Sequence, residues 1–441
     1  MYDILIKDAT IIRPEGRLVA DIGIEDGRIT YLGGNPGGRG HEEVSAIGRF
    51  VMPGVIDSHV HFRDPGHTYK EDWGSGSRAA VATGVTTVLD MPNTSPATLD
   101  VASARAKLSH ASECSVSNFG VWVAGTADNI AQANEAWDAG LVCGIKVFMG
   151  DTTGGMVVPS EALGEIFGSG SGLIGVHAEE DKTLLEARAR MRDQEAPCHN
   201  EVRPPSAALA AVTRLVELVR ATNRPLHVCH LSTSDELELL APLRGELPIT
   251  SEVTPHHLYL SVETSSDQGN RIKVNPPIRS ELDRRALWTA IRRNHIDTFG
   301  SDHAPHTAEE KALPYWDAPS GIPGVDTLYP LLMSSVKNTR MSLEAMVQMC
   351  CTAPARIFDL KGKGVIEVGA DADLILFREG ATSRLTEDDL RTKVGWSPFI
   401  GREIGVPPDL VVLNGRIAAR SGVLADELAL GQPVRYGRTA E

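Results

Sequence analysis

The stretch GVIDSHVHFRDPGH, residues Gly54–His67, places ionisable side chains directly after a short apolar run. Apolar strands normally end in turns of Gly, Asn, Ser and Pro. His59 and His61 are two residues apart, so in an extended chain their side chains point to one side, while Val60 and Phe62 point away. The stretch therefore predicts a strand whose end carries a candidate functional site.

Seven further apolar runs follow in the middle of the chain, and amphipathic helical stretches separate them. Strands that alternate with helices in this way are typical of βα units. Eight of them predict the α/β class and a (β/α)8 barrel, in which the C-terminal ends of all strands meet at one face. The expected strands are residues 54–57, 84–91, 118–125, 143–149, 172–178, 225–231, 248–254 and 296–302.

The two ends of the chain read differently from the middle. Both alternate short β-like runs with Asp-Gly or Gly-Gly pairs, as antiparallel strands require, and we expect them to join into one small β-sandwich. The sequence thus predicts three parts: residues 1–53 as the N-terminal part of the sandwich, residues 54–363 as the barrel with a helical extension, and residues 364–441 as the C-terminal part of the sandwich.

Composition narrows the class of protein. The 441 residues are 42% hydrophobic, and 58 acidic residues against 43 basic ones give a formal net charge of -15. This charge disfavours binding to nucleic acid or to an anionic membrane. The N-terminus lacks the features of a signal peptide, no apolar run approaches the ~20 residues of a membrane span, and the six cysteines form no CxxC pair. We expect a cytoplasmic protein with reduced thiols.

Ionisable residues recur at the ends of the expected strands. Each has an ordinary explanation when taken alone, such as a hydrogen-bonded core histidine, a helix cap or a sheet-edge lysine. Together they would meet at the C-terminal face of a barrel, where imidazole nitrogen and carboxylate oxygen suit zinc-like ions. The pattern therefore predicts a metal centre. Its candidate ligands are His59, His61, Lys146, His177, His230 and Asp302.

Lys146 is the most informative of these residues because a charged ammonium between Ile145 and Val147 would be costly to bury unpaired. Near metal cations the neutral amine is favoured, and a neutral amine can take up carbon dioxide to form an anionic carbamate. Carboxylated Lys146 could then bridge two divalent metal ions, for which we expect Zn2+. Such a pair activates water and polarises a carbonyl, and Asp302 would serve first as base and then as acid.

The motifs that hold these residues resemble the amidohydrolase superfamily, and within its cyclic-amidohydrolase branch they are closest to the dihydroorotases. The resemblance extends through essentially the whole chain. It implies that His59 and His61 bind one metal, that His177 and His230 bind the second, and that Asp302 is both ligand and proton shuttle. The motifs are PGVIDSHVHFRDPG, MPNTSPAT, GIKVFMG, GVHAEE, HVCHLST, NPPIR, GSDHAPHT and SGIPGVDT.

The resemblance also implies a substrate-binding set. Arg63, Asn93 and His306 match the positions that hold a substrate carboxylate, and Asn275 matches the asparagine that contacts the pyrimidine ring. An arginine fork suits a carboxylate, which dihydroorotate carries and which dihydrouracil, hydantoin and allantoin lack. The implied activity is the reversible cyclisation of N-carbamoyl-L-aspartate to L-dihydroorotate, a step of pyrimidine biosynthesis.

Two other functions stay open at this point. A dihydropyrimidinase, hydantoinase or allantoinase would share the metal site, but the carboxylate-binding set argues against it. A non-catalytic scaffold, for example one that holds a transcarbamoylase, would not need all six metal ligands. We expect a homo-oligomer, a dimer or tetramer, that acts on a small molecule, and a transcarbamoylase partner stays open.

Other polar residues have a plainer interpretation. We expect His199 and the acidic run Glu179–Asp181 to be solvated loop and helix-start groups. His256 and His257 are expected to pack or to hydrogen-bond behind the metal ligands. The segment 309–324 is rich in Gly and Pro, and it predicts either a lid over the site or an ordinary ordered loop.

Overall fold

A computed structural model describes residues 1–151 and 155–439. Each of the eight expected strands is present. The third is divided at Trp122: its residues up to Val121 pair with the second strand, to which the Trp122 N–H still donates at the Asp90 carbonyl oxygen (2.9 Å), and pairing with the fourth strand begins at Val123. The barrel strands are β6 (Val55–Val60), β7 (Val85–Asp90), β8 (Asn118–Val121), β9 (Val123–Ala124), β10 (Ile145–Phe148), β11 (Ile174–His177), β12 (Leu226–Val228), β13 (Ile249–Val253) and β14 (Thr298–Phe299).

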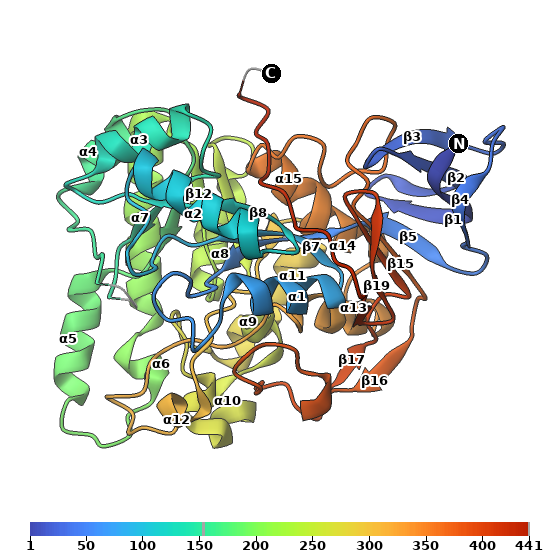
Figure 1. The fold of residues 1–441 in the computed structure, drawn as a ribbon. Helices are drawn as coiled ribbons and strands as arrows, with labels where there is room; N and C mark the ends of the chain where they lie inside the picture. The colour runs from blue at the N-terminus through green and yellow to red at the C-terminus, as the bar shows by residue number, and fades with distance from the viewer. Residues whose placement is uncertain (152–154, 440–441) are drawn as a thin grey trace.

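These strands close into a barrel by parallel pairing. β6, β7 and β8 form one run, and β9 to β14 form a second run in chain order. The first strand meets the segment after the last one through a parallel bridge between Val60 and His303, where the His61 N–H donates to the His303 carbonyl oxygen at 2.8 Å. The predicted α/β barrel is confirmed (Figure 1).

Helices cover the outside of the barrel and bury one apolar face each. In α7, for example, Ala211, Leu215 and Val219 are buried, and Asn223 ends the helix in a left-handed conformation. The helices are α1 (Trp73–Ala82), α2 (Val101–Cys114), α3 (Ile130–Asp138), α4 (Leu163–Gly168), α5 (Asp181–Met191), α6 (His199–Val202), α7 (Pro205–Thr222), α8 (Ser234–Leu240), α9 (Pro255–Tyr259), α10 (Val262–Ser265), α11 (Glu281–Arg292), α12 (Ala308–Lys311), α13 (Leu328–Lys337), α14 (Leu343–Val347) and α15 (Ala353–Ile357).

The two ends of the chain form one sheet structure beside the barrel, at the right of Figure 1. The first half of β1 pairs with β4 and its second half with β5, and β5 pairs antiparallel with β15, so the N- and C-terminal segments share a core. The strands are β1 (Tyr2–Arg13), β2 (Gly16–Glu25), β3 (Arg28–Gly33), β4 (Gly40–Ser45), β5 (Phe50–Pro53), β15 (Leu374–Phe377), β18 (Leu410–Leu413), β19 (Arg416–Arg420) and β20 (Val423–Leu424), with a separate hairpin of β16 (Thr382–Arg384) and β17 (Glu403–Gly405).

The C-terminal segment also returns to the barrel. The indole N–H of Trp396 donates to the His306 carbonyl oxygen (2.8 Å), and Val434 pairs with Phe119 beside β8. The division of the chain at residues 53 and 363 stays a prediction, and residues 440–441 of its last part lie outside the described residues. None of the described helices combines the length and apolar character needed to cross a bilayer.

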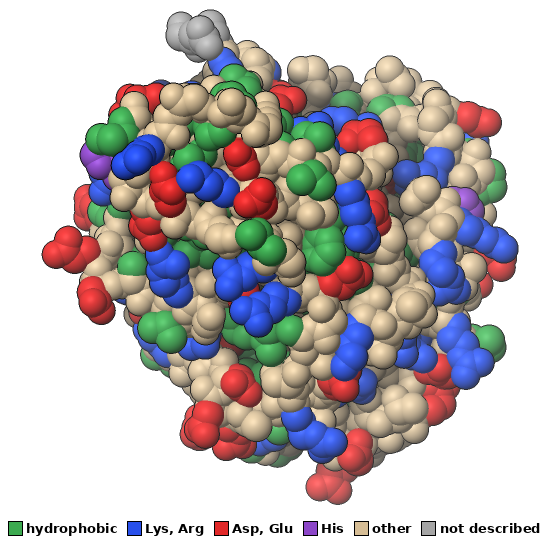
Figure 2. All heavy atoms as spheres, turned by 90° about the vertical axis from the view of Figure 1, so that its right-hand side faces the viewer, with side chains coloured by type: hydrophobic (Ala, Val, Ile, Leu, Met, Phe, Trp, Pro, Cys, Tyr) green, Lys and Arg blue, Asp and Glu red, His purple; other side chains and the backbone are tan. Residues whose placement is uncertain are grey.

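The face on the sandwich side carries basic and acidic side chains interspersed with scattered apolar ones (Figure 2). Five large apolar side chains of the two terminal segments are more than 60% exposed: Met1, Val19, Ile47, Val368 and Val423.

Candidate metal centre

Nine of the ten residues singled out from the sequence line one cavity at the C-terminal ends of the barrel strands, and the tenth, His306, contacts Arg63 within it. They come together because parallel strands bring their C-terminal ends to the same face of a barrel. The nine are His59, His61, Arg63, Asn93, Lys146, His177, His230, Asn275 and Asp302.

His59, His61 and Asp302 form the first group of candidate ligands. Asp302 Oδ1 lies 3.3 Å from His59 Nε2 and 3.2 Å from His61 Nε2, and all three side chains are buried. Two ligand atoms on one tetrahedral zinc, each about 2.0–2.1 Å from the metal, are themselves about 3.3 Å apart. These three atoms therefore fit a shared metal ion.

The remaining ring nitrogens of these two histidines are held by other side chains. His59 Nδ1 lies 2.8 Å from Glu252 Oε1, and His61 Nδ1 lies 2.7 Å from Asn93 Oδ1. Since both oxygens accept a hydrogen bond, each Nδ1 carries the proton and each Nε2 lone pair faces Asp302. Burial lowers the pKa of both histidines, which keeps the rings neutral as metal ligation requires.

His177 and His230 form the second group. His177 Nδ1 lies 3.1 Å from His230 Nε2, again a separation that two ligands of one metal show. Within residues 1–151 and 155–439, this pair has no cysteine or carboxylate that completes a close three-ligand group like the one around Asp302. A third ligand would have to come from Lys146, which lines the same cavity.

Lys146 is almost fully buried, and its environment does not balance a positive charge. Its Nζ lies 2.9 Å from Cys229 Sγ, and no described carboxylate lies within 4 Å of it. Burial raises the pKa of Cys229 to about 11, so this partner is a neutral thiol. A buried amine beside a thiol and the Phe148 ring (5.3 Å from Nζ to the ring centre), next to two groups of candidate metal ligands, fits conversion to an anionic carbamate.

Arg63 presents the same problem elsewhere in the cavity. It is buried, donates to the Pro305 carbonyl oxygen (3.3 Å), and has no ion pair with any described carboxylate. Burial lowers its pKa to about 10, so the guanidinium still carries its charge near neutral pH. A buried cation without an anionic partner fits a ligand that brings its own carboxylate.

His306 and Asn275 are already engaged by neighbouring groups. Lys70 donates to His306 Nδ1 (3.0 Å), and His306 Nε2 donates to the Ser320 carbonyl oxygen (3.1 Å), which places the ring 3.2 Å from Arg63 Nη2. Asn275 Oδ1 accepts from His199 Nε2 at 3.0 Å. Both side chains are therefore held in place at the cavity wall.

Three residues of the cavity have left-handed backbone conformations that residues other than glycine rarely adopt. The φ angles are 62° at Arg63, 36° at His230 and 45° at Asp302. Such conformations cost free energy and persist where the surrounding structure enforces them, often at functional sites. Burial also raises the pKa of Asp302, which makes this carboxylate a better proton carrier than an exposed aspartate.

One of the plainer sequence interpretations is wrong. Glu179 is fully buried rather than solvated, since it binds His177, Arg203 and Arg279. His199 begins α6, as expected of a helix-start group; it is half-buried and uses both ring nitrogens, one toward Asn275 and one toward the Tyr315 hydroxyl (2.7 Å). Arg203 is 24 residues from Glu179 and Tyr315 is 116 residues from His199, so the local pattern carried no signal for these contacts.

Glu252 is the residue that sequence reasoning missed altogether. Its carboxylate is buried behind His59 and also accepts from the Ser58 hydroxyl at 2.8 Å. A signal existed, because an acid inside the apolar strand run PITSEVT is costly to bury without partners.

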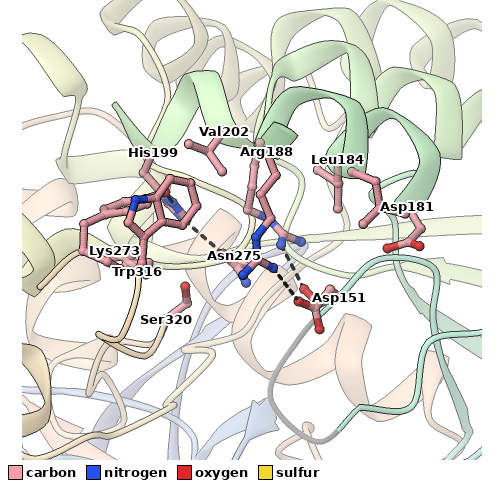
Figure 3. A pocket seen from close by; sticks show the side chains of 13 residues that line it. Asp151, Asp181, Leu184, Arg188, His199, Val202, Lys273, Asn275, Trp316 and Ser320 are labelled. Carbon is pink, nitrogen blue, oxygen red and sulfur yellow. Dashed lines mark hydrogen bonds and ion pairs between the residues drawn. The ribbon is translucent and has the colours of Figure 1, made fainter. Parts of the chain in front are cut away.

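An outer pocket adjoins the cavity and shares Asn275 and Ser320 with it. Figure 3 shows Arg188, His199 and Lys273 around this pocket, with Asp151 beside Arg188 (3.6 Å). One wall belongs to the segment 309–324, which two lysines secure. Lys311 Nζ donates to the carbonyl oxygens of Lys273, Pro319 and Gly321, and Lys273 Nζ donates to those of Tyr315 and Ala318. In this structure the segment is an ordered loop.

The barrel and the ligand groups at its C-terminal face define a class of metal-dependent barrel hydrolases. Residues 50–418 match the model of the amidohydrolase family, and the chain belongs to this family. Dihydroorotases from Methanosarcina acetivorans and Halobacterium salinarum are each 38% identical to it, over 95% and 93% of this chain and 92% and 95% of theirs.

Solved structures of the same fold are also similar. The L-hydantoinase (dihydropyrimidinase) from Arthrobacter aurescens superposes with a TM-score of 0.93 at 28% identity, covering 99% of this chain and 100% of that one. A D-hydantoinase gives a TM-score of 0.89 at 26% identity over 98% and 99% of the two chains. The predicted barrel with its β-sandwich agrees with these neighbours.

Proposed function

We propose that the chain is a hydrolase of cyclic amide C–N bonds that interconverts N-carbamoyl-L-aspartate and L-dihydroorotate. The dihydroorotase relatives, similar over nearly their whole length, support this reaction. The observation that carries it is Arg63, a buried cation in the cavity with no described carboxylate beside it. Among the cyclic ureides considered, dihydroorotate is the one that supplies a carboxylate.

The metal centre would be held by this chain's own ligands. His59, His61 and Asp302 would hold one divalent ion, and His177 and His230 a second, with carboxylated Lys146 between them. We propose zinc, because imidazole and carboxylate ligands at tetrahedral spacing suit it. When bound, such ions supply Lewis acidity toward the amide carbonyl.

The protein residues would perform the remaining steps. Arg63 would bind the substrate carboxylate. His306, which contacts the Arg63 guanidinium, would keep this part of the cavity wall in place, and Asn275 would orient the substrate ring. In the hydrolytic direction water adds to the ring carbonyl carbon and the C–N bond breaks. A carboxylate oxygen of Asp302 would take the proton of the water and pass it to the departing ring nitrogen. Cyclisation is the reverse.

The alternative is a hydrolase of neutral rings. The close superposition on an L-hydantoinase favours it, because the fold accommodates that reaction as well. It would leave Arg63 buried without an anion, which costs free energy, and sequence identity to the dihydroorotases is higher. We therefore place it second.

We also propose a homo-oligomer, a dimer or tetramer, since exposed apolar side chains lie on both terminal segments. Light scattering of the purified protein tests it, and a monomer would contradict it. Binding to a transcarbamoylase stays a prediction from the resemblance alone.

The experiment that tests the reaction compares turnover of dihydroorotate, dihydrouracil, hydantoin and allantoin by zinc-loaded protein. We expect turnover of dihydroorotate alone. Arg63→Met should lower kcat/KM by about 100-fold or more, because two charge-assisted hydrogen bonds contribute roughly 1.5–3 kcal/mol each. Arg78→Met, at an exposed arginine of α1, is the matched control. Turnover of a neutral ring that survives Arg63→Met would overturn the proposed substrate.

A further inference from the structure

Glu179 lies two residues after His177, and its side chain is completely buried. One carboxylate oxygen, Oε2, accepts from His177 Nε2 at 2.8 Å and from Arg203 Nε at 3.0 Å and Nη2 at 2.5 Å. The other oxygen, Oε1, lies 3.7 Å from Arg279 Nη2. The carboxylate is thus shared between a candidate metal ligand and two buried cations.

This contact decides which nitrogen of His177 carries the proton. A carboxylate paired with arginines only accepts hydrogen bonds, and its 2.8 Å contact with Nε2 is much shorter than the 3.4 Å from Arg203 Nη2, so Nε2 is the protonated nitrogen of the neutral ring. Nδ1 then keeps its lone pair, and Nδ1 is the atom that lies 3.1 Å from His230 Nε2. His177 can therefore ligate only through Nδ1, whereas His59 and His61 present Nε2.

Glu179 is itself held in place from behind. Arg203 Nη1 donates to the Asp151 carbonyl oxygen at 2.9 Å, and Asp151 borders the outer pocket of Figure 3. Arg279 Nη1 donates to Asn200 Oδ1 at 2.7 Å and to the Arg203 carbonyl oxygen at 2.5 Å. These contacts keep the carboxylate pointing at His177.

We propose that Glu179 is a positioning residue of the metal centre, which holds His177 in the tautomer and orientation that present Nδ1 to the second metal ion. The proposal rests on the metal centre of the proposed function but not on its substrate. A purely structural ion pair with Arg203 would not need His177 on the same oxygen, and its loss would lower stability without changing metal affinity.

The first test compares zinc affinity, measured by competition with a fluorescent chelator, in three variants. Glu179→Gln removes the charge at the same size and should weaken binding at one of the two sites by about 10-fold, within the range of about 10–100-fold seen for such partners. Glu180→Gln makes the same change at the next residue, whose side chain binds Thr183, and should leave affinity unchanged. Equal zinc affinities in the two variants would overturn the proposal.

A charge-balanced double variant guards against misfolding. Glu179→Met combined with Arg203→Met removes the acceptor without leaving Arg203 buried and unpaired, and it should weaken the same site by up to about 100-fold. Normal zinc affinity in this folded variant would contradict the proposal as directly as an unchanged Glu179→Gln.

The second test needs no metal and no variant of Glu179. Nitrogen NMR of metal-free protein with labelled histidine distinguishes Nε2–H from Nδ1–H rings, and His177→Gln identifies the signal of His177. We expect His177 in the Nε2–H form, and an Nδ1–H form would contradict the proposed role of Glu179. Both tests read tautomer or zinc affinity, so they stand even if dihydroorotate is not turned over.

Discussion

Lys146 shows, at the scale of one residue, how burial and metal chemistry are connected. Its amine is buried beside Cys229 with no described carboxylate within 4 Å, an arrangement that a carbamate would resolve. We predict that zinc-loaded protein prepared with carbon-13 bicarbonate shows a carbamate carbon signal by NMR. The Lys146→Met variant should lose that signal and the metal ion at His177 and His230, for which Lys146 would be the third ligand. A free amine at Lys146 in fully metallated, active protein would contradict the prediction.

His257 predicts a pH dependence of stability. Its Nε2 donates to the Pro276 carbonyl oxygen and its Nδ1 lies 2.8 Å from the Thr254 hydroxyl, and burial lowers its pKa to about 4. Below the ordinary histidine pKa of about 6.5, His257 becomes protonated in the unfolded chain, whereas in the folded protein it stays neutral until the pH approaches about 4. Stability from this residue is therefore complete above pH ~6.5 and falls as the pH drops toward ~4.

The size of this effect can be measured by urea unfolding across that pH range. One proton over about 2.5 pH units corresponds to roughly 3 kcal/mol at most. His257→Gln removes the titrating ring, so the pH dependence should become shallower by up to this amount. An unchanged slope would show that His257 is protonated in the folded protein as easily as in the unfolded chain.

At the scale of an element, the segment between α12 and α13 depends on Lys311. This buried lysine donates to three carbonyl oxygens that close the loop over the outer pocket. Lys311→Met leaves these acceptors without their donor, at a cost of about 1–3 kcal/mol each where they stay buried. We predict faster amide hydrogen exchange in residues 312–323 and a raised KM for dihydroorotate, since Ser320 and Gly321 line the cavity.

Lys337→Met is the control for this prediction. Lys337 is an exposed lysine of α13 that bonds Thr382 and Glu403, away from the loop. The Lys337→Met variant should leave both the amide hydrogen exchange of the loop and the KM unchanged. Normal exchange in the Lys311→Met loop would mean that packing, rather than these hydrogen bonds, orders the segment.

At the scale of the whole molecule, the two ends of the chain are one structural unit. Pairing of β5 with β15 places Leu374, Leu376 and Val412 in a core with residues of β1 and β2. A chain that ends at residue 363 exposes that core and the edge of β5. We predict that residues 1–363 alone are insoluble and that coexpressed residues 364–441 restore soluble protein.

A tag on the second fragment measures this rescue by copurification. Leu374→Asp in that fragment should abolish it, because the charge would enter the shared core. A soluble, cooperatively melting 1–363 fragment would instead support the division of the chain at residue 363 as a boundary between independent units.

The sequence by itself determined the features that depend on neighbours along the chain. His59 and His61 face one side because side chains alternate along a strand, and eight apolar runs that alternate with helices predict a barrel. Since Lys146, His177, His230 and Asp302 lie in or just after the fourth, fifth, sixth and eighth strands, the order of the strands is enough to place them at one face. The division of the third strand at Trp122 could not be predicted in this way, because it depends on which neighbouring strand each of its residues pairs with.

Tertiary structure alone decided what stands behind these ligands. Glu252 reaches His59 across 193 residues, and Glu179 meets Arg203 24 residues away. Asn93, expected at the substrate, lines the cavity and in addition lies against His61. These contacts depend on how the barrel closes, and a hydrogen bond between distant residues leaves no periodic trace in the sequence. The ligand types were therefore readable from the chain, whereas the orientation of each ring was set by partners that only the folded barrel brings near.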